Sequence, residues 1–182
     1  GLGHAVLCAK PAVGNNPFAV ILADDMILSK TNGCLKQMAE KYIELNSSII
    51  AVEKVKKEYL HKYGIIQGSK INQSDWELKN IVEKPEIENA PSDMGVVGRY
   101  ILNESIFDIL ENTKKGAGEE IQLTDALASQ ITKEKVYAYE FEGKRFDCGN
   151  KLGFLKATIE YGLHHGELSK DLKDYLKNLD LS

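Results

Sequence analysis

Two acidic side chains, Asp24 and Asp25, directly follow the apolar run FAVILA at residues 18–23. A short, uninterrupted apolar run is typical of a strand buried on both faces. In open α/β sheets ligands bind at the carboxyl ends of strands, so both acids fall where a ligand would be expected. One of them could hold Mg²⁺, which takes one or two protein carboxylates and completes its shell with phosphates and water. A turn or a helix cap explains the same pair, because Asp is common in turns.

A third acid, Asp147, stands between an aromatic residue and Cys-Gly in the segment GKRFDCGNKLGF, just ahead of a predicted helix. It is a second candidate carboxylate for a metal ion. Taken alone, the segment is explained more simply by an ordinary N-terminal helix boundary.

The segment IVEKP at residues 81–85 joins an acid to a base at the end of a predicted strand. Pro85 disfavours helix for the residue before it and predicts an extended Lys84. A carboxylate such as Glu83 can accept two sugar hydroxyls, while an ammonium meets a phosphate as a compact charge. Adjacent strand residues point to opposite faces, so both serve one ligand only if the strand twists or ends there. A solvated charge pair is the alternative.

Composition narrows the class of protein. The 182 residues are 43% hydrophobic and 27% charged, which is ordinary for one soluble domain of mixed architecture. The net charge of -4 is spread along the chain, which argues against nucleic acid or an anionic membrane as the main partner. Cys8, Cys34 and Cys148 show no metal-ligand spacing and predict free thiols in a reducing compartment. With no apolar run of roughly 20 residues and no secretory signal at the first residues, we expect a cytoplasmic protein.

The elements that must position these side chains alternate between strand and helix. After the strand at residues 18–23, a helix at 35–45 and a strand at 48–52 form a βαβ pattern. This predicts an α/β fold with a mixed, mainly parallel sheet flanked by helices. The other expected elements are an antiparallel pair at 64–71 and 77–83, strands at 95–102 and 136–141, a helix at 106–110 capped by Asn103, a helix opened by Thr124 and Asp125, and terminal helices at 151–164 and 168–179.

Seven segments, taken together and in order, point to a known family. They are GLGHAVLCAKP, PFAVILADD, YGII, IVEKP, VGRYIL, GAGEEIQLTDAL and FDCGNKLGFLKATIEYGL. Nearly end to end, the chain resembles the bacterial UTP:glucose-1-phosphate uridylyltransferases. The resemblance implies a Rossmann-like nucleotidyltransferase fold and an enzyme that works on UTP, glucose 1-phosphate and UDP-glucose. It also implies a homo-oligomer contact through the terminal helix.

In such enzymes the phosphate of glucose 1-phosphate attacks the α-phosphorus of UTP in line, giving UDP-glucose and pyrophosphate. Catalysis consists mainly of aligning two anions and neutralising charge with Mg²⁺ and basic groups. By motif position the resemblance makes Asp24 and Asp147 the metal-binding carboxylates, with Asp25 secondary. Ala23 stands where the family usually has proline, a change that would loosen the turn without removing a ligand.

The same resemblance assigns the substrate-binding residues. Gly1 would lie against uracil, where a missing side chain lets the backbone approach the base. Gly64 would offer its backbone to the sugar. Glu83 would offer its carboxylate to the glucose hydroxyls, and Lys84, the expected catalytic residue, would bring its charge to the glucose phosphate.

One family feature is missing from this sequence. The family opens with a strand and a glycine-rich loop, G-x-G-T-R followed by P-K-E, whose amides and basic side chains hold the triphosphate. Residues 1–182 therefore resemble the C-terminal part of a single nucleotidyltransferase domain, incomplete at its N-terminus, with a terminal helical segment at 150–182. We expect these residues alone to bind sugar phosphate poorly and not to turn over.

Two alternatives remain open. A related sugar-nucleotide pyrophosphorylase would use another base or sugar, although GLGHA and the Asp-Cys-Gly-Asn-Lys segment favour the uridylyl branch. A noncatalytic binding or assembly module would keep the sugar site without the triphosphate loop. Binding of UDP-glucose without turnover would favour that module.

Overall fold

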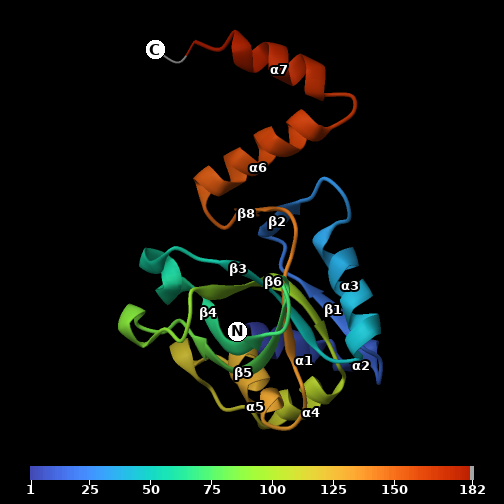
Figure 1. Cartoon of the computed structure of the whole chain (residues 1–182), viewed down its shortest axis with the longest axis vertical. Coiled ribbons are helices and arrows are strands. Elements are labelled where there is room, and N and C mark those ends of the chain that lie inside the picture. Colours follow the sequence, from blue (N-terminus) through green and yellow to red (C-terminus); the bar gives the residue numbers. More distant parts are fainter. Residues whose placement is uncertain (181–182) are drawn as a thin grey trace. The chain divides into compact units, whose positions relative to one another are not determined.

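The computed structural model describes residues 1–180, and the chain divides into two compact units (Figure 1). Unit 1 consists of Gly1–Leu22 and Cys34–Glu142. Unit 2 consists of Ala23–Gly33 and the chain from Gly143 onward. That residues 1–182 form part of one nucleotidyltransferase domain stays a prediction.

A six-stranded sheet forms the centre of unit 1. Only the β3–β7 pair is parallel among its described neighbours, and the other pairs are antiparallel. The α/β class with a mixed sheet and flanking helices is therefore confirmed, but the strand directions differ from the mainly parallel arrangement that the sequence predicts. The reason is that β6 runs in the opposite direction between β1 and β3, so these two strands are not neighbours. In sheet order the strands are β1 (Phe18–Ile21), β6 (Met94–Leu102), β3 (Ile49–Lys54), β7 (Tyr137–Glu140), β5 (Asp75–Glu83) and β4 (Gly64–Lys70).

The edge strand β1 departs from its prediction. Its residues alternate between half-buried and exposed, and Ile21 is 53% exposed. Within residues 1–180, β1 pairs on one side only, with β6. The prediction of a strand buried on both faces is thus wrong for this chain, because a second neighbouring layer and strand are needed to bury such a run.

Helices cover both faces of the sheet (Figure 1). Successive residues of a strand face opposite sides, and Ile50 and Val52 of β3 belong to the main core with α1, α4 and α5. Ile49 and Ala51 face the other side, where α3 packs against β3 and β6. The ring of Phe18 stacks on Phe107 of α4, with 4.8 Å between centroids. The helices of unit 1 are α1 (Leu2–Cys8), α2 (Lys10–Val13), α3 (Cys34–Leu45), α4 (Ser105–Asn112) and α5 (Leu123–Ile131), with 3₁₀ turns η1 (Lys57–Lys62), η2 (Ile87–Asn89) and η3 (Ala117–Glu119).

The predicted cap of α4 is wrong. Glu104 is the N-cap residue, and the side chain of Asn103 instead accepts a hydrogen bond of 2.8 Å from the Tyr42 hydroxyl of α3. Asn103 therefore connects α3 to the end of β6 and does not cap the start of α4.

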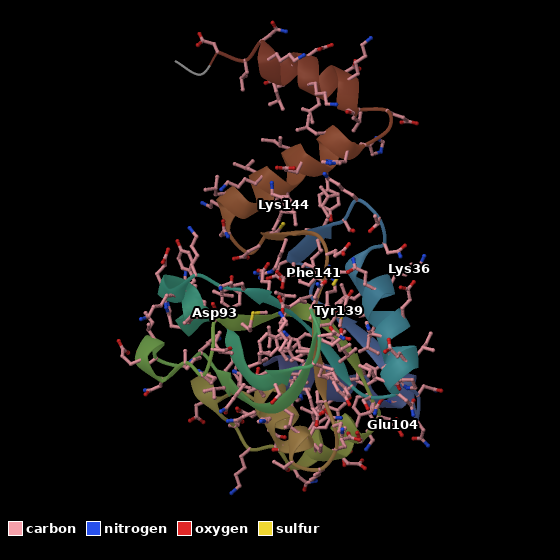
Figure 2. The ribbon with its side chains drawn as sticks, in the orientation of Figure 1. Lys36, Asp93, Glu104, Tyr139, Phe141 and Lys144 are labelled. Carbon is pink, nitrogen blue, oxygen red and sulfur yellow. The ribbon has the colours of Figure 1, made fainter. Side chains whose placement is uncertain are left out.

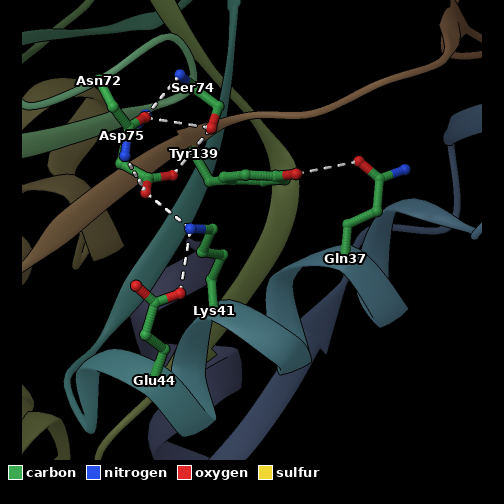
Figure 3. Close-up of polar contacts among 7 residues, drawn as sticks. All are labelled: Gln37, Lys41, Glu44, Asn72, Ser74, Asp75 and Tyr139. Carbon is green, nitrogen blue, oxygen red and sulfur yellow. Dashed lines mark hydrogen bonds and ion pairs between the residues drawn. The ribbon is translucent and has the colours of Figure 1, made fainter.

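A polar network fastens α3 to the sheet (Figure 3). The buried carboxylate of Asp75, at the start of β5, lies 2.9 Å from the Lys41 ammonium. It also accepts hydrogen bonds from Asn72 at 2.7 Å and from Ser74 at 3.0 Å. Lys41 meets a second carboxylate, Glu44, at 3.1 Å on the exposed side of the helix.

The first turn of α3 makes its own connection to β7. The hydroxyl of Tyr139, labelled in Figure 2, donates to the side-chain oxygen Oε1 of Gln37 at 3.4 Å. The same oxygen accepts from the Glu142 backbone N–H at 2.8 Å, while Nε2 of the Gln37 side chain donates to the Glu142 backbone carbonyl at 2.9 Å. Polar side chains thus fix α3 at both ends of its contact with the sheet.

Unit 2 contains a short antiparallel pair, β2 (Asp25–Leu28) with β8 (Lys144–Asp147), followed by α6 (Lys151–His164) and α7 (Ser169–Lys177). Both terminal helices are confirmed. The side chain of Asn150 caps α6 by accepting a hydrogen bond of 2.7 Å from the Gly153 backbone. The β2–β8 pair was not predicted, because its two four-residue strands lie far apart in the sequence and carry no strong periodicity.

None of the helices described in residues 1–180 combines the length and the apolar character needed to cross a membrane.

Candidate functional site

Glu83 and Lys84 converge although they are neighbours in the sequence. Strand β5 ends at Glu83, and Lys84 then adopts a positive φ of 44°. The Lys84 backbone amide donates to the Tyr63 carbonyl at 3.0 Å, which holds this conformation. The Lys84 ammonium lies 3.5 Å from Glu83 Oε1. Both side chains can serve one ligand only if the strand twists or ends here. The strand does end here, at Glu83.

The predicted extended conformation of Lys84 is wrong. Pro85 disfavours the right-handed helical region for the residue before it, but it leaves the left-handed region open. A non-glycine residue at positive φ costs of order 1–3 kcal/mol, and such residues cluster at functional sites. Lys84 is the positive-φ residue that belongs to the candidate site.

Gly64 lies opposite Glu83 across the β4–β5 pair. A Cβ atom at Gly64 would stand 3.3 Å from Thr124 Cγ2 and 3.4 Å from Glu83 Oε2, tighter than ordinary packing. A side chain at position 64 would crowd the Glu83 carboxylate, and glycine avoids this contact. The predicted contact of the Gly64 backbone with a sugar stays a prediction.

Thr124 is the residue of this cluster that sequence reasoning missed. It was expected only to open a helix, and it does lie in the first turn of α5. Its hydroxyl also donates a 2.7 Å hydrogen bond to Glu83 Oε2, across 41 residues of sequence. Burial, and then the negative charge of Glu83, raise the pKa of the neighbouring Asp125. The first turn of α5 therefore brings two groups to the Glu83 carboxylate: the Thr124 hydroxyl as a hydrogen-bond donor and the Asp125 carboxylate as a second negative charge.

The glycines of the GLGHA segment pack against the chain that leads into α5. The Gly3 amide donates to the Ile121 carbonyl at 3.0 Å. A Cβ atom at Gly1 would stand 2.7 Å from the Cβ of Glu120 and 2.9 Å from the Ile121 carbonyl oxygen. Glycine is thus needed here because the GLGHA segment packs closely against Glu120 and Ile121, which the sequence did not reveal. The contact of Gly1 with uracil stays a prediction.

In unit 2 the two predicted metal-binding carboxylates lie together. The position of a Cβ at Gly149 is 3.1 Å from Asp147 Oδ1 and 3.2 Å from Asp24 Oδ2. The Cys148 amide donates to the Asp24 carbonyl at 2.7 Å, and the Gly149 amide donates to Asp147 Oδ1 at 3.0 Å. Both acids are exposed, so a cation can reach them.

Asp25 has a different environment from these two acids. It is 6% exposed, and its carboxylate forms a hydrogen-bonded ion pair with the buried guanidinium of Arg145 on the partner strand. This pair holds β2 and β8 in the register that sets Asp147 opposite Asp25. Asp25 thus joins the segment that carries Asp24 to the strand that carries Asp147.

The donor set fits a hard divalent cation. Among residues 1–180, no group of three or more His, Cys, Asp or Glu side chains converges as a metal site. Two carboxylates suffice for Mg²⁺, which keeps water and phosphate oxygens as its other ligands. Asp24 and Asp147 are the residues that would hold it.

Residues 1–162 match the family model described as nucleotidyl transferase. The chain belongs to the nucleotidyl transferase family. Among the relatives of this nucleotidyl transferase, the UTP--glucose-1-phosphate uridylyltransferase of Staphylococcus epidermidis is 49% identical over 181 residues. That alignment covers 100% of this chain and 62% of the relative, so the chain spans less than two thirds of the relative's length.

Two solved structures resemble this nucleotidyl transferase in three dimensions. One, of a UDP-glucose pyrophosphorylase complexed with UDP-glucose, has a TM-score of 0.87 and 46% identity, covering 91% of this chain and 63% of that one. The other, a UTP-bound UGPase from Acinetobacter baumannii, has a TM-score of 0.88 and 41% identity, covering 99% and 62%. The fold is therefore shared with proteins whose structures were determined with UDP-glucose and with UTP.

Proposed function

We propose that this chain serves uridylyl transfer from UTP to glucose 1-phosphate, giving UDP-glucose and pyrophosphate, in the protein made from its complete reading frame. The observation that carries the proposal is the convergence of Glu83 and Lys84 at the end of β5, with 3.5 Å between the ammonium and Oε1. The names of the similar proteins support the choice of base and sugar.

The two side chains have complementary tasks toward a sugar phosphate. Glu83 accepts hydrogen bonds from glucose hydroxyls, which fixes the rotation of the ring. Lys84 places a compact positive charge at the glucose phosphate. That phosphate must approach the α-phosphorus of UTP in line, against the repulsion between two anions. Lys84 reduces this repulsion, and Glu83 restricts the orientation from which the attack takes place.

Asp24 and Asp147 hold Mg²⁺ in this proposal. The bound cation would neutralise charge on the phosphates and on the pyrophosphate leaving group. Asp25 and Arg145 hold together the two segments that carry these acids, because their ion pair joins β2 to β8. Replacing Asp24 or Asp147 by Asn is expected to weaken divalent-cation binding.

The proposal extends to a homo-oligomer in the cytoplasm. Leu152, Phe154 and Leu155 on α6 and Tyr175 on α7 are each more than half exposed. A second copy of the chain would bury such apolar side chains. All three thiols are unpaired, which suits a reducing compartment. Light scattering at increasing protein concentration checks the assembly, and a monomer at every concentration would contradict it.

Substitutions at the end of β5 test the catalytic proposal. Lys84→Met removes the charge with little loss of volume, and Lys79→Met makes the same change at an exposed position of the same strand. We expect Lys84→Met to lower kcat/KM for glucose 1-phosphate about 100-fold or more, because it removes a charged contact with a phosphate. Lys79→Met should stay within about twofold of the wild-type protein. Equal rates for the two variants would count against the role of Lys84.

A further inference from the structure

The Glu83 carboxylate is held on both of its oxygens. Oε2 accepts the 2.7 Å hydrogen bond from the Thr124 hydroxyl, and Oε1 lies 3.5 Å from the Lys84 ammonium. Only 13% of the Glu83 side chain is exposed. A carboxylate with a fixed donor on one oxygen presents its remaining lone pairs in defined directions.

We propose that Thr124 is a positioning residue that orients the Glu83 carboxylate for the sugar hydroxyls. The inference rests on the proposed function and deepens it, because it names the residue that sets how well the site recognises the sugar. Thr124 acts through Glu83 and is not itself assigned a contact with the substrate.

The hydroxyl of Thr124 orients Glu83 without neutralising it. A basic residue at this place would compete with the sugar for the carboxylate, whereas a neutral hydroxyl donates one bond and leaves the charge intact. Thr124 lies in the first turn of α5, a nine-residue helix whose N-terminal end favours a negative group. The Asp125 carboxylate works in the opposite sense, because its charge and that of Glu83 repel each other. A neutral donor therefore fixes Oε2 of the carboxylate, while Oε1 faces the Lys84 ammonium.

The methyl group of Thr124 fixes the direction of this donor. A Cβ at Gly64 would stand 3.3 Å from Thr124 Cγ2 and 3.4 Å from Thr124 Oγ1, so any larger residue at position 64 would crowd the Thr124 side chain. A β-branched side chain has few χ1 rotamers, so few directions are open to the Thr124 hydroxyl. Three elements, β4, β5 and α5, thus meet at the Glu83 carboxylate. Serine at this position would keep the donor without the methyl, and valine would keep the shape without the donor.

Steady-state kinetics of the protein from its complete reading frame separate these contributions. Hydrogen bonds to charged groups correspond to about 10- to 100-fold in affinity, so Thr124→Val should raise KM for glucose 1-phosphate about tenfold or more. KM for UTP should stay within about twofold, and Thr124→Ser should recover most of the loss. Thr113→Val is the matched control, because the Thr113 hydroxyl also donates one bond, to the Ile109 carbonyl at 2.8 Å, away from Glu83.

The outcomes distinguish this inference from the function on which it rests. If the wild-type protein makes no UDP-glucose, the proposed function fails and the role of Thr124 falls with it. If the wild-type protein is active and folded Thr124→Val keeps its KM for glucose 1-phosphate, only the positioning role is overturned. An equal rise in KM for UTP would also overturn it, because that is the signature of a general structural defect. If Thr124→Val does not fold, the ¹³C resonance of the Glu83 carboxyl decides in Thr124→Ala, which also removes the hydroxyl: the resonance should move in Thr124→Ala and not in Thr113→Val, and an unmoved resonance in Thr124→Ala would refute the contact.

Discussion

Replacing Asp75 by Ala should strongly destabilise unit 1, because Asp75 is the centre of a buried polar network. The Asp75 side chain is 5% exposed, and it pairs with Lys41 while accepting hydrogen bonds from Asn72 and Ser74. Breaking a buried ion pair by removing one partner typically costs about 3–5 kcal/mol, because the remaining charge and donors lose their partner. We therefore expect Asp75→Ala to lower the free energy of unfolding by about that amount.

Lys41 supplies an internal control, because it contacts two carboxylates in different environments. The Glu44 side chain is 63% exposed and lies 3.1 Å from the same ammonium. Exposed pairs three or four residues apart on a helix contribute about 0.3–0.5 kcal/mol. Glu44→Ala should therefore cost no more than about 0.5 kcal/mol, and the contrast between the two variants isolates the effect of burial.

Urea unfolding followed by fluorescence of the single tryptophan, Trp76, measures both variants, with circular dichroism as a second probe. The pH dependence gives an independent check. Burial opposes ionisation of Asp75, but the hydrogen bonds from Asn72, Lys41 and Ser74 lower its pKa. A carboxyl whose pKa is lowered by folding stabilises the protein above its unfolded pKa of about 3.9, and the contribution is lost as the pH falls through the folded pKa. The difference between the wild-type protein and Asp75→Ala should thus be full at pH 7 and shrink below about pH 4.

The reasoning is refuted if Asp75→Ala proves as mild as Glu44→Ala at pH 7. It is also refuted if the stability difference stays constant through the acid range, since the ionised form of Asp75 would then contribute nothing.

Further predictions concern packing and thiol chemistry. Gly95→Ala should cost about 1–3 kcal/mol in urea unfolding, because its Cβ would stand 2.5 Å from a core methyl group, whereas Gly33→Ala, with nothing within 4 Å, should be nearly neutral. Gly153→Ala should weaken divalent-cation binding in isothermal titration, because its Cβ would stand 1.8 Å from the carbonyl oxygen of a predicted metal-binding residue; unchanged affinity would show that this loop does not depend on the glycine. Burial raises the pKa of the Cys34 thiol to about 11, so at pH 8 a thiol reagent followed by mass spectrometry should label exposed Cys8 long before Cys34, and equal labelling rates would contradict its burial.

Local patterns predicted the elements whose partners lie close in the sequence. The helical spacing of Leu35, Met38 and Tyr42 matches α3, and the alternation in residues 64–71 and 77–83 matches β4 and β5. Periodicity reports which face of an element is apolar, and in these elements the apolar face and the buried face coincide.

The features that the sequence did not predict depend on contacts between distant segments. The position of β6 between β1 and β3 follows from pairings between residues 40 to 84 positions apart in the sequence, which no local pattern encodes. The positive φ of Lys84 depends on the Tyr63 carbonyl, and the role of Thr124 depends on a carboxylate 41 residues away. The motif residues of the site were found from resemblance, whereas the residue that orients one of them required the fold.

The most direct test of the central claim is ³¹P NMR of the protein from its complete reading frame, incubated with Mg²⁺, glucose 1-phosphate and each of the common nucleoside triphosphates in turn. The proposed function predicts that the signals of UDP-glucose and pyrophosphate appear when UTP is the nucleotide supplied. It also predicts that these signals are lost in the Lys84→Met variant. Stable signals of UTP and glucose 1-phosphate, or faster turnover of another nucleotide, would contradict uridylyl transfer.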